Sequence, residues 1–297
     1  MSKIYLHIGS EKTGSTTLQR FLSLNRDNLE SDGFTYFCGE NQICYSQGRY
    51  GHFPIVASFY AVTPDFISTA EHYENTTMLS SIQQELISES RHVILSCEHF
   101  SSRLTKVADL EKLAEALRSH EVSVVFYMRP QSELLLSAYS TAVLNGRRTP
   151  LSVDEINADN PYLNYYKLLD VWASVFGHHK IMVRDYKKLK AGDICEDFMH
   201  LLGIEDLSHY ERPRNRNKSM PPKQVEFVRR LNAYIPTYEE VGSDWHRVLV
   251  RFRKMLRYAW FIFRKKDEGS SDDFIRGVDA VFEESNAKLS RLFINRT

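Results

Sequence analysis

The amino-acid sequence predicts an α/β fold in which helices flank a central parallel sheet in three layers. First, short apolar runs typical of strands alternate with segments whose apolar residues recur every three or four positions, as in helices. Second, these runs are almost continuous in hydrophobicity, which indicates strands buried on both faces of a parallel sheet. Third, a loop rich in glycine and hydroxyl residues joins the first strand to the first helix, an arrangement that directs backbone N–H groups at an anion.

The predicted elements alternate along the chain. The strands cover residues 3–8, 92–97, 122–128 and 180–184. The helices are a segment from about 15 to 29, three segments with apolar stripes that begin at Leu110, Leu135 and Leu168, and a segment capped by Asp193 that runs to Leu202.

The 297 residues are expected to form a single domain. Residues 32–90 are rich in Tyr, Phe, Ser, Asn and Gly and have weak periodicity, so an irregular excursion beside the sheet is expected there. Residues 221–297 are charged and helical in pattern, and a helical C-terminal region is expected.

Composition limits the function classes. Apolar residues make up 42% of the chain and charged residues 26%, ordinary values for a globular protein. The formal net charge is zero, so overall charge favours neither nucleic acid nor a membrane as partner. No apolar run approaches a membrane span, and the N-terminal run is too short for a signal peptide. The four cysteines lack metal-ligand spacing, so we expect reduced thiols and a cytoplasmic protein.

The loop after the first strand, HIGSEKTGSTTLQ at residues 7–19, is close to a phosphate-binding P-loop. Gly9 and Gly14 have the P-loop spacing, but Ser15 occupies the position of the P-loop lysine. The lysine of this loop is Lys12, three residues earlier. The sequence therefore predicts a P-loop-like cradle with its cation on a different side.

The ends of two later strands bear on the ligand. The run HVILSC leads to Glu98 and His99, and the run VSVVFYM leads to Arg129, so neither supplies an aspartate suited to a metal. A ligand that binds in this cradle but requires little metal would be one whose transferred group carries less charge than a phosphoryl group. A sulfuryl group meets that requirement.

KTGSTTLQ resembles the 5′-phosphosulfate loop of PAPS-dependent sulfotransferases, which typically show Lys-[Ser/Thr]-Gly-[Ser/Thr]-Thr. RPQSELLLS at 129–137 resembles the segment in which the family has a strand-end arginine and a helix serine. SCEHFS at 96–101 resembles the strand end that carries the family's catalytic base. RNRNKS at 214–219 resembles the polar loop that the family places over the cofactor. The resemblance covers residues 3 to about 235 and is nearest to the bacterial and carbohydrate-directed branch. The carboxyl-terminal Arg-Lys-Gly motif of the cytosolic branch is missing, which leaves the second 3′-phosphate clamp open.

The resemblance implies roles for named residues. Lys12 would stabilise the leaving phosphate, and the donor's 5′-phosphate would lie in the cradle formed by Thr13, Gly14, Ser15, Thr16 and Thr17. The 3′-phosphate and the rest of the donor would be bound by Arg129, Ser137, Arg214, Arg216 and Lys218. The general base would be Glu98 or His99, with Glu98 favoured because other features lean to the carbohydrate branch. The donor would be PAPS, the product PAP, and no metal would be required.

The acceptor is expected to be a hydroxyl group of a carbohydrate or glycolipid. Candidates for an acceptor-binding wall are Tyr45, Arg49, Tyr50, His52, Tyr139, Arg147 and Arg148. Two other functions stay open: a P-loop nucleoside or sugar kinase, and a non-catalytic nucleotide-binding module. His7, inside the first strand, is expected to be a core histidine rather than a catalyst.

Residues 246–266 combine many basic side chains with apolar positions at helical spacing. The favoured interpretation is a helix that docks on the protein through its apolar stripe. The other is an interfacial helix that makes peripheral contact with an anionic membrane.

Overall fold

The computed structural model describes residues 2–38, 51–60, 78–189, 193–213, 220–234 and 272–294. The chain forms two compact units. The first, which we call the sheet unit, comprises Met1–Arg129, Asp159–Asn215 and Glu283–Thr297. The second, the helical unit, comprises Pro130–Ala158 and Arg216–Phe282.

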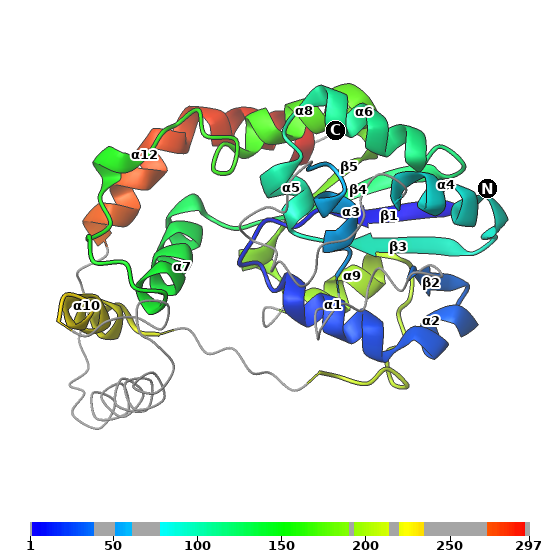
Figure 1. The fold of residues 1–297 in the computed structure, drawn as a ribbon, viewed down its shortest axis with the longest axis horizontal. Helices are drawn as coiled ribbons and strands as arrows, with labels where there is room; N and C mark the ends of the chain where they lie inside the picture. The colour runs from blue at the N-terminus through cyan, green and yellow to red at the C-terminus, as the bar shows by residue number, and fades with distance from the viewer. Residues whose placement is uncertain are drawn as a thin grey trace. The chain divides into compact units, whose positions relative to one another are not determined.

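Five parallel strands form the sheet of the sheet unit, in the order β2-β3-β1-β4-β5 (Figure 1). They are β1 (Lys3–His7), β2 (Phe34–Tyr36), β3 (His92–Ser96), β4 (Glu121–Met128) and β5 (Ile181–Asp185). Four of them match the predicted strands to within a residue. The central strand, β1, lies between β3 and β4, so three carboxyl ends meet beside the loop that follows β1.

Helices cover both faces of this sheet (Figure 1). One face carries α1 (Ser15–Leu24), α2 (Arg26–Ser31) and α9 (Ile194–Leu201). The other carries α4 (Met78–Ser88), α6 (Val107–Ala116) and α8 (Tyr165–Phe176). Two short helices, α3 (Phe53–Ala57) and α5 (His99–Arg103), pack together near the end of β3. The predicted α/β fold, P-loop-like with a central parallel sheet between helical layers, is confirmed.

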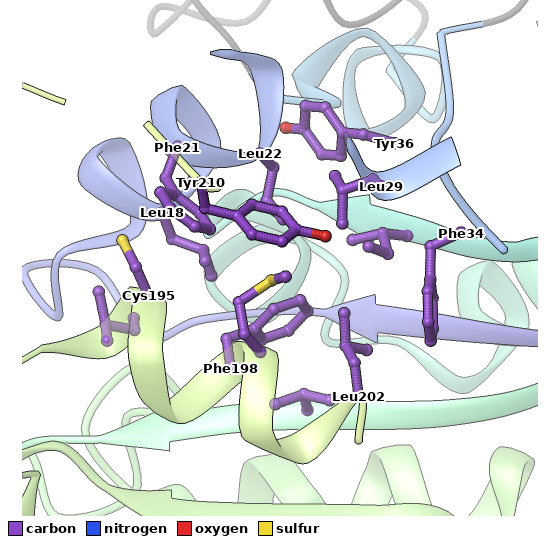
Figure 2. Packing of buried hydrophobic residues seen from close by; sticks show 14 of the residues in the cluster. Leu18, Phe21, Leu22, Leu29, Phe34, Tyr36, Cys195, Phe198, Leu202 and Tyr210 are labelled. Atoms are coloured by element: carbon purple, nitrogen blue, oxygen red, sulfur yellow. The ribbon is translucent and has the colours of Figure 1, made fainter. Parts of the chain in front are cut away.

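The core under α1 explains why the first helix forms where it does. Leu18, Phe21 and Leu22 lie on one face of α1 and are fully buried. Figure 2 shows them facing Phe198 of α9 and Leu202, the residue that follows α9. Burial of each such side chain stabilises the fold by about 1.5–3 kcal/mol, so this face fixes α1, and with it the loop, against the sheet.

The helix predicted from 15 to 29 is instead two helices, because Asn25 interrupts it. Asn25 has a non-helical backbone. Its side-chain amide donates to the carbonyl of Phe21 at 2.8 Å and to that of Glu211 at 2.9 Å. Its side-chain oxygen accepts from the Glu211 amide at 2.7 Å. The asparagine thus ends α1 and ties it to the chain after α9.

The segment predicted as an irregular excursion, residues 32–90, contains regular elements in its described parts. β2 pairs with β3 in the sheet, and α3 and α4 are helices. The expectation that this segment lies only beside the sheet was therefore wrong. The reason is length: β2 has three residues, too few to show a periodicity.

The helical unit contains α7 (Gln131–Leu144) and α10 (Pro222–Leu231), and α12 (Asp272–Leu289) begins in it. Tyr139 and Val143 of α7 pack against Val225 and Val228 of α10. The helices α10 and α12 lie within the predicted helical region 221–297, whereas residues 246–266 lie outside the described residues. In the described part of the chain, no helix is long and apolar enough to cross a membrane.

The cysteines differ from the prediction in one respect. Cys97 and Cys195 are free and buried, as expected of reduced thiols. Cys38 is disulfide-bonded, so the expectation of four reduced thiols was wrong for this residue. The spacing of the cysteines gave no indication of this pairing.

Candidate functional site

The loop between β1 and α1 is held open by three left-handed backbone positions. Gly9, Lys12 and Gly14 have φ values of +67°, +64° and +84°. A side chain on Gly9 would place its Cβ 3.0 Å from the Cα of Glu98, a tighter contact than nearly all real Cβ atoms make. Glycine is therefore required there both for its conformation and for the close approach of the chain after β3.

Backbone hydrogen bonds anchor the two ends of the loop. The amide of Ser10 donates to the carbonyl of Tyr127 at 3.0 Å, which extends the ladder between β1 and β4. The carbonyl of Gly14 accepts from the amides of Thr17 and Leu18 and so begins α1. Within the described residues, the four amides from residue 13 to residue 16 donate to no backbone carbonyl. These amides lie in the loop and in the first turn of α1, where a helix favours an anion.

The hydroxyl groups of the loop divide into two kinds. Thr13 is fully buried, and its Oγ1 donates to the carbonyl of Ser10 at 2.6 Å, so it holds the loop together. Ser15 is only 4% exposed, yet its Oγ has no hydrogen-bond partner among the residues that the structure describes. Thr16 is exposed and Thr17 is half-buried. Most buried hydroxyls are hydrogen-bonded, so an unsatisfied one beside unpaired amides indicates a place for a ligand that accepts hydrogen bonds.

Arg129, at the end of β4, contacts this loop directly. Its Nη1 donates to the carbonyl of Lys12 at 2.9 Å. Its own carbonyl accepts from the hydroxyl of Tyr165 at 2.8 Å, which fixes the backbone at that point. Arg129 thus supports the conformation of the loop, and its predicted contact with a 3′-phosphate stays a prediction.

Glu98 lies on the opposite side of the loop, at the start of α5. Its Oε2 accepts a hydrogen bond from the side-chain amide of Gln19, which comes from α1, at 2.8 Å. The ideal Cβ position on Gly9 lies 3.0 Å from the Glu98 Cβ and 3.3 Å from the Ser15 Oγ. The base of the Glu98 side chain and the unsatisfied hydroxyl therefore lie on the same side of Gly9.

His99 also lies beside the loop. Its Nδ1 is 3.7 Å from the Oε1 of Glu11, whose Oε2 accepts from the hydroxyl of Tyr162 at 3.3 Å. Burial raises the pKa of the Glu11 carboxyl, but the nearby polar side chains of His99, Ser102 and Tyr162 outweigh it, so the net pKa is lowered.

The alternation of strand side chains does not decide between Glu98 and His99. β3 ends at Ser96, and α5 begins at His99. Both side chains reach the loop region, through Gln19 for Glu98 and through Glu11 for His99. Because β3 ends before Glu98, the order of side chains along the strand leaves the choice between Glu98 and His99 open.

His52, a candidate for the acceptor wall, is structural instead. It is fully buried, its Nδ1 accepts from the amide of Ser96 at 3.0 Å, and its Nε2 donates to the carbonyl of Phe37. Burial lowers the pKa of His52 to about 4 against two backbone hydrogen bonds that raise it, so the ring is neutral at pH 7. His7 is a core histidine, as predicted: it is fully buried, bonds the Ser96 hydroxyl at 2.7 Å, and burial lowers its pKa to about 3.

The remaining candidate residues are spread over the chain. Tyr139 and Arg147 are engaged in the helical unit, where Tyr139 donates to Glu226 and the Arg147 guanidinium lies 5.4 Å from the Tyr139 ring centroid. Ser137 is half-buried on α7, in the same unit. The candidates Tyr45, Arg49, Tyr50, Arg214, Arg216 and Lys218 lie outside the described residues.

Sequence reasoning missed Gln19, Glu11, Tyr162 and Tyr165. A signal was present for Gln19, because it is a polar residue within the buried stripe of α1 and lies one turn after Ser15. The three others contact the site through long-range packing that no spacing reveals. Among the described residues, no group of three or more His, Cys, Asp or Glu side chains could hold a metal ion.

No family model matches this chain. An uncharacterized protein of Archaeoglobus fulgidus is 28% identical to it over 142 residues, which are 47% of this chain and 38% of that relative. The chain therefore spans less than two-fifths of the length of the curated relative it matches. Among solved structures, this chain is similar to a sulfotransferase from Alicyclobacillus acidocaldarius, with a TM-score of 0.42 and 14% identity over 88% of this chain and 98% of that one.

Proposed function

We propose that this protein is a sulfotransferase that moves the sulfuryl group of PAPS to a hydroxyl group of an acceptor. The observation that carries the proposal is the set of donors at the start of α1. The first amides of any helix lack an intrahelical acceptor. Among the described residues, the amides of Thr13 and Gly14 before the helix also donate to no backbone carbonyl, and the buried hydroxyl of Ser15 has no hydrogen-bond partner. A phosphate ester accepts several hydrogen bonds and suits such a position.

In the proposed reaction, the acceptor oxygen attacks sulfur in line with the bond to the bridging oxygen. That bond breaks, and its electrons remain on the phosphate of PAP. The loop amides and Ser15 bind the 5′-phosphate, while the Lys12 ammonium stabilises the charge that develops on the bridging oxygen. Glu98 takes the proton of the acceptor hydroxyl. The 3′-phosphate contacts of Arg129, Ser137 and residues 214–218 rest on the sequence resemblance.

We favour Glu98 over His99 as the base. Glu98 lies against Gly9 in the loop and accepts a hydrogen bond from a neutral amide, which leaves its negative charge uncompensated by that partner. His99 is instead directed toward Glu11, with its Nδ1 3.7 Å from Oε1 of that residue. The proposed acceptor, a carbohydrate or glycolipid, rests on the resemblance to the carbohydrate-directed branch.

A P-loop kinase is the second candidate, and the position of Glu98 favours it. A carboxylate near the loop is what a nucleotide-bound magnesium ion requires. Against it, the position of the P-loop lysine is occupied by the buried Ser15, and Glu98 is engaged by Gln19. These two features leave the transferred phosphoryl group without its usual cation, so we rank the kinase second.

Ligand-dependent thermal unfolding tests the proposal. PAP at about 100 times its dissociation constant is expected to stabilise the protein by about 2.7 kcal/mol, whereas ATP with Mg²⁺ is expected to have little effect. Transfer is then measured with radiolabelled PAPS and a panel of glycans and glycolipids. Stabilisation by ATP with Mg²⁺ but not by PAP would contradict the sulfotransferase and support the kinase. PAP binding without transfer to any acceptor would support the non-catalytic module.

A further inference from the structure

Gln19 is an unusual residue on the buried face of α1. It is only 6% exposed and lies next to Leu18 in the stripe that packs on the sheet. A buried side-chain amide destabilises a fold unless it is hydrogen-bonded. Its Nε2 donates to Oε2 of Glu98 at 2.8 Å. The amide is oriented with its nitrogen toward the carboxylate, because its oxygen would be repelled there.

Gly51 fixes that amide from the other side. A Cβ on Gly51 would lie 2.7 Å from Cδ of Gln19 and 2.8 Å from both Nε2 and Oε1, so the glycine backbone packs directly on the amide group. The next residue, His52, is anchored to the end of β3, since its amide donates to the carbonyl of Ser96 at 2.9 Å. The end of β3 thereby fixes both Glu98 and the residue that covers its partner.

We propose that Gln19 is a positioning residue for sulfuryl transfer, and that Gly51 keeps it in place. Gln19 holds the carboxylate of Glu98 at one orientation beside the loop, so that the base is aligned with the acceptor hydroxyl before the reaction. A neutral amide can do this without adding a positive charge that would weaken the base. This inference rests on the proposed function with Glu98 as the base.

The first test is Gln19→Leu, which keeps a similar volume and removes the donor. The turnover number is expected to fall about tenfold to a hundredfold, while the dissociation constant of PAP and the KM for PAPS change less than about threefold. In a Glu98→Gln background, Gln19→Leu is expected to have no further effect on turnover, because the two residues act as one unit. Gln83→Leu is the matched control, since in the described part of the chain the Gln83 amide donates to the carbonyl of Glu115 and to no other group.

The second test is Gly51→Ala. The new Cβ would meet the flexible end of Gln19, so the amide moves aside at little cost to stability. Turnover is expected to fall in the same direction as for Gln19→Leu, and the alanine is expected to have little effect once Gln19 is leucine. If Gln19→Leu weakens PAP binding as much as it lowers turnover, Gln19 supports the loop rather than the base, and the inference is overturned.

Crystal structures of the two variants separate this inference from the proposed function. If the wild-type protein transfers no sulfuryl group, the proposed function fails, but the position of Glu98 can still be observed. The inference expects the Glu98 carboxylate to be displaced, or to occupy several rotamers, in Gln19→Leu and in Gly51→Ala. An unchanged Glu98 side chain in both variants would overturn it whatever the activity.

Discussion

The Nη1 of Arg129 donates a hydrogen bond to the carbonyl of Lys12 at 2.9 Å. Arg129 follows β4, and Lys12 is the one described non-glycine residue with a positive φ. A left-handed conformation costs an ordinary residue roughly 1–2 kcal/mol. The hydrogen bond therefore joins the end of a strand to the strained residue of the loop, and it gives Arg129 a role in holding the loop as well as its predicted role in binding the donor.

Arg129→Ala separates these two roles. Loss of the contact with Lys12 is expected to weaken binding of AMP, which has only a 5′-phosphate, by about tenfold. PAP also has a 3′-phosphate, so its affinity is expected to fall further, by another factor of about ten or more. Isothermal titration calorimetry with both ligands measures the difference. Equal losses for AMP and PAP would mean that Arg129 acts on the loop alone.

Lys12→Ala tests the role of the ammonium group. Turnover is expected to fall by about a hundredfold or more, because the charge acts on the oxygen that becomes negative in the transition state. PAP lacks the sulfuryl group, so its dissociation constant is expected to change only a few-fold. Steady-state kinetics and PAP titration are compared. A loss of PAP affinity equal to the loss of turnover would place the lysine on the ground-state phosphate instead.

Lys12→Gly is the companion variant, and it tests the backbone strain at this position. It also removes the charge, so its turnover is expected to match that of Lys12→Ala. It relieves the left-handed strain, so its melting temperature is expected to be at least as high as that of the alanine variant, although glycine usually destabilises. A clearly lower melting temperature for glycine would show that the φ of +64° is not strained.

The parts of the site that follow directly along the chain could be predicted from the sequence. The loop lies between one strand and one helix, so its glycines, its hydroxyls and Lys12 could be located by spacing alone. Arg129 and Glu98 could be located because each directly follows an apolar run. Their common location follows because parallel strands bring their carboxyl ends to one edge of the sheet. Their roles toward a donor stay predictions.

The partners of these residues could not be predicted in the same way. Gln19 and Glu98 are 79 positions apart, and Arg129 and Lys12 are 117 apart, so only the folded sheet brings them together. The choice between Glu98 and His99 rested on the resemblance to the carbohydrate-directed branch, because no spacing shows which partners the two side chains meet. His52 has a side chain common in binding sites, but burial at the end of β3 commits it to the backbone.

Stability is expected to decrease as the pH falls below about 6.5. Burial lowers the pKa of His52 from 6.5 to about 4 and that of His7 to about 3. Between these values the unfolded chain binds protons that the folded chain does not, so each histidine adds a slope of up to about 1.4 kcal/mol per pH unit. The stability from these groups is fully present above pH 6.5 and is lost as the pH falls toward 4.

Urea unfolding at pH 8, 7, 6 and 5 measures this slope. The free energy of unfolding is expected to be nearly constant between pH 8 and 7 and to fall between pH 6 and 5. His52→Gln retains a donor and an acceptor but does not titrate. The decrease in its free energy of unfolding per pH unit is therefore expected to be smaller, by up to the contribution of one proton. A free energy that is constant from pH 7 to 5 in the wild type would contradict the neutral, buried state of both rings.

Removal of the Ser15 hydroxyl and removal of the Thr13 hydroxyl are expected to have opposite effects on stability and on PAP binding. Ser15→Ala removes a buried hydroxyl that has no partner, so the melting temperature of the free protein is expected to stay the same or rise. Thr13→Val keeps the shape of the side chain but removes its hydrogen bond to the carbonyl of Ser10. It is expected to destabilise the protein by about 1–3 kcal/mol, because that carbonyl then loses its partner.

The affinity for PAP is expected to show the reverse order. PAP is expected to bind about tenfold more weakly to Ser15→Ala, but with nearly unchanged affinity to folded Thr13→Val at a temperature well below its transition. If Ser15→Ala destabilises the free protein and leaves PAP binding unchanged, the hydroxyl is structural, and the phosphate site at the start of α1 loses its main support.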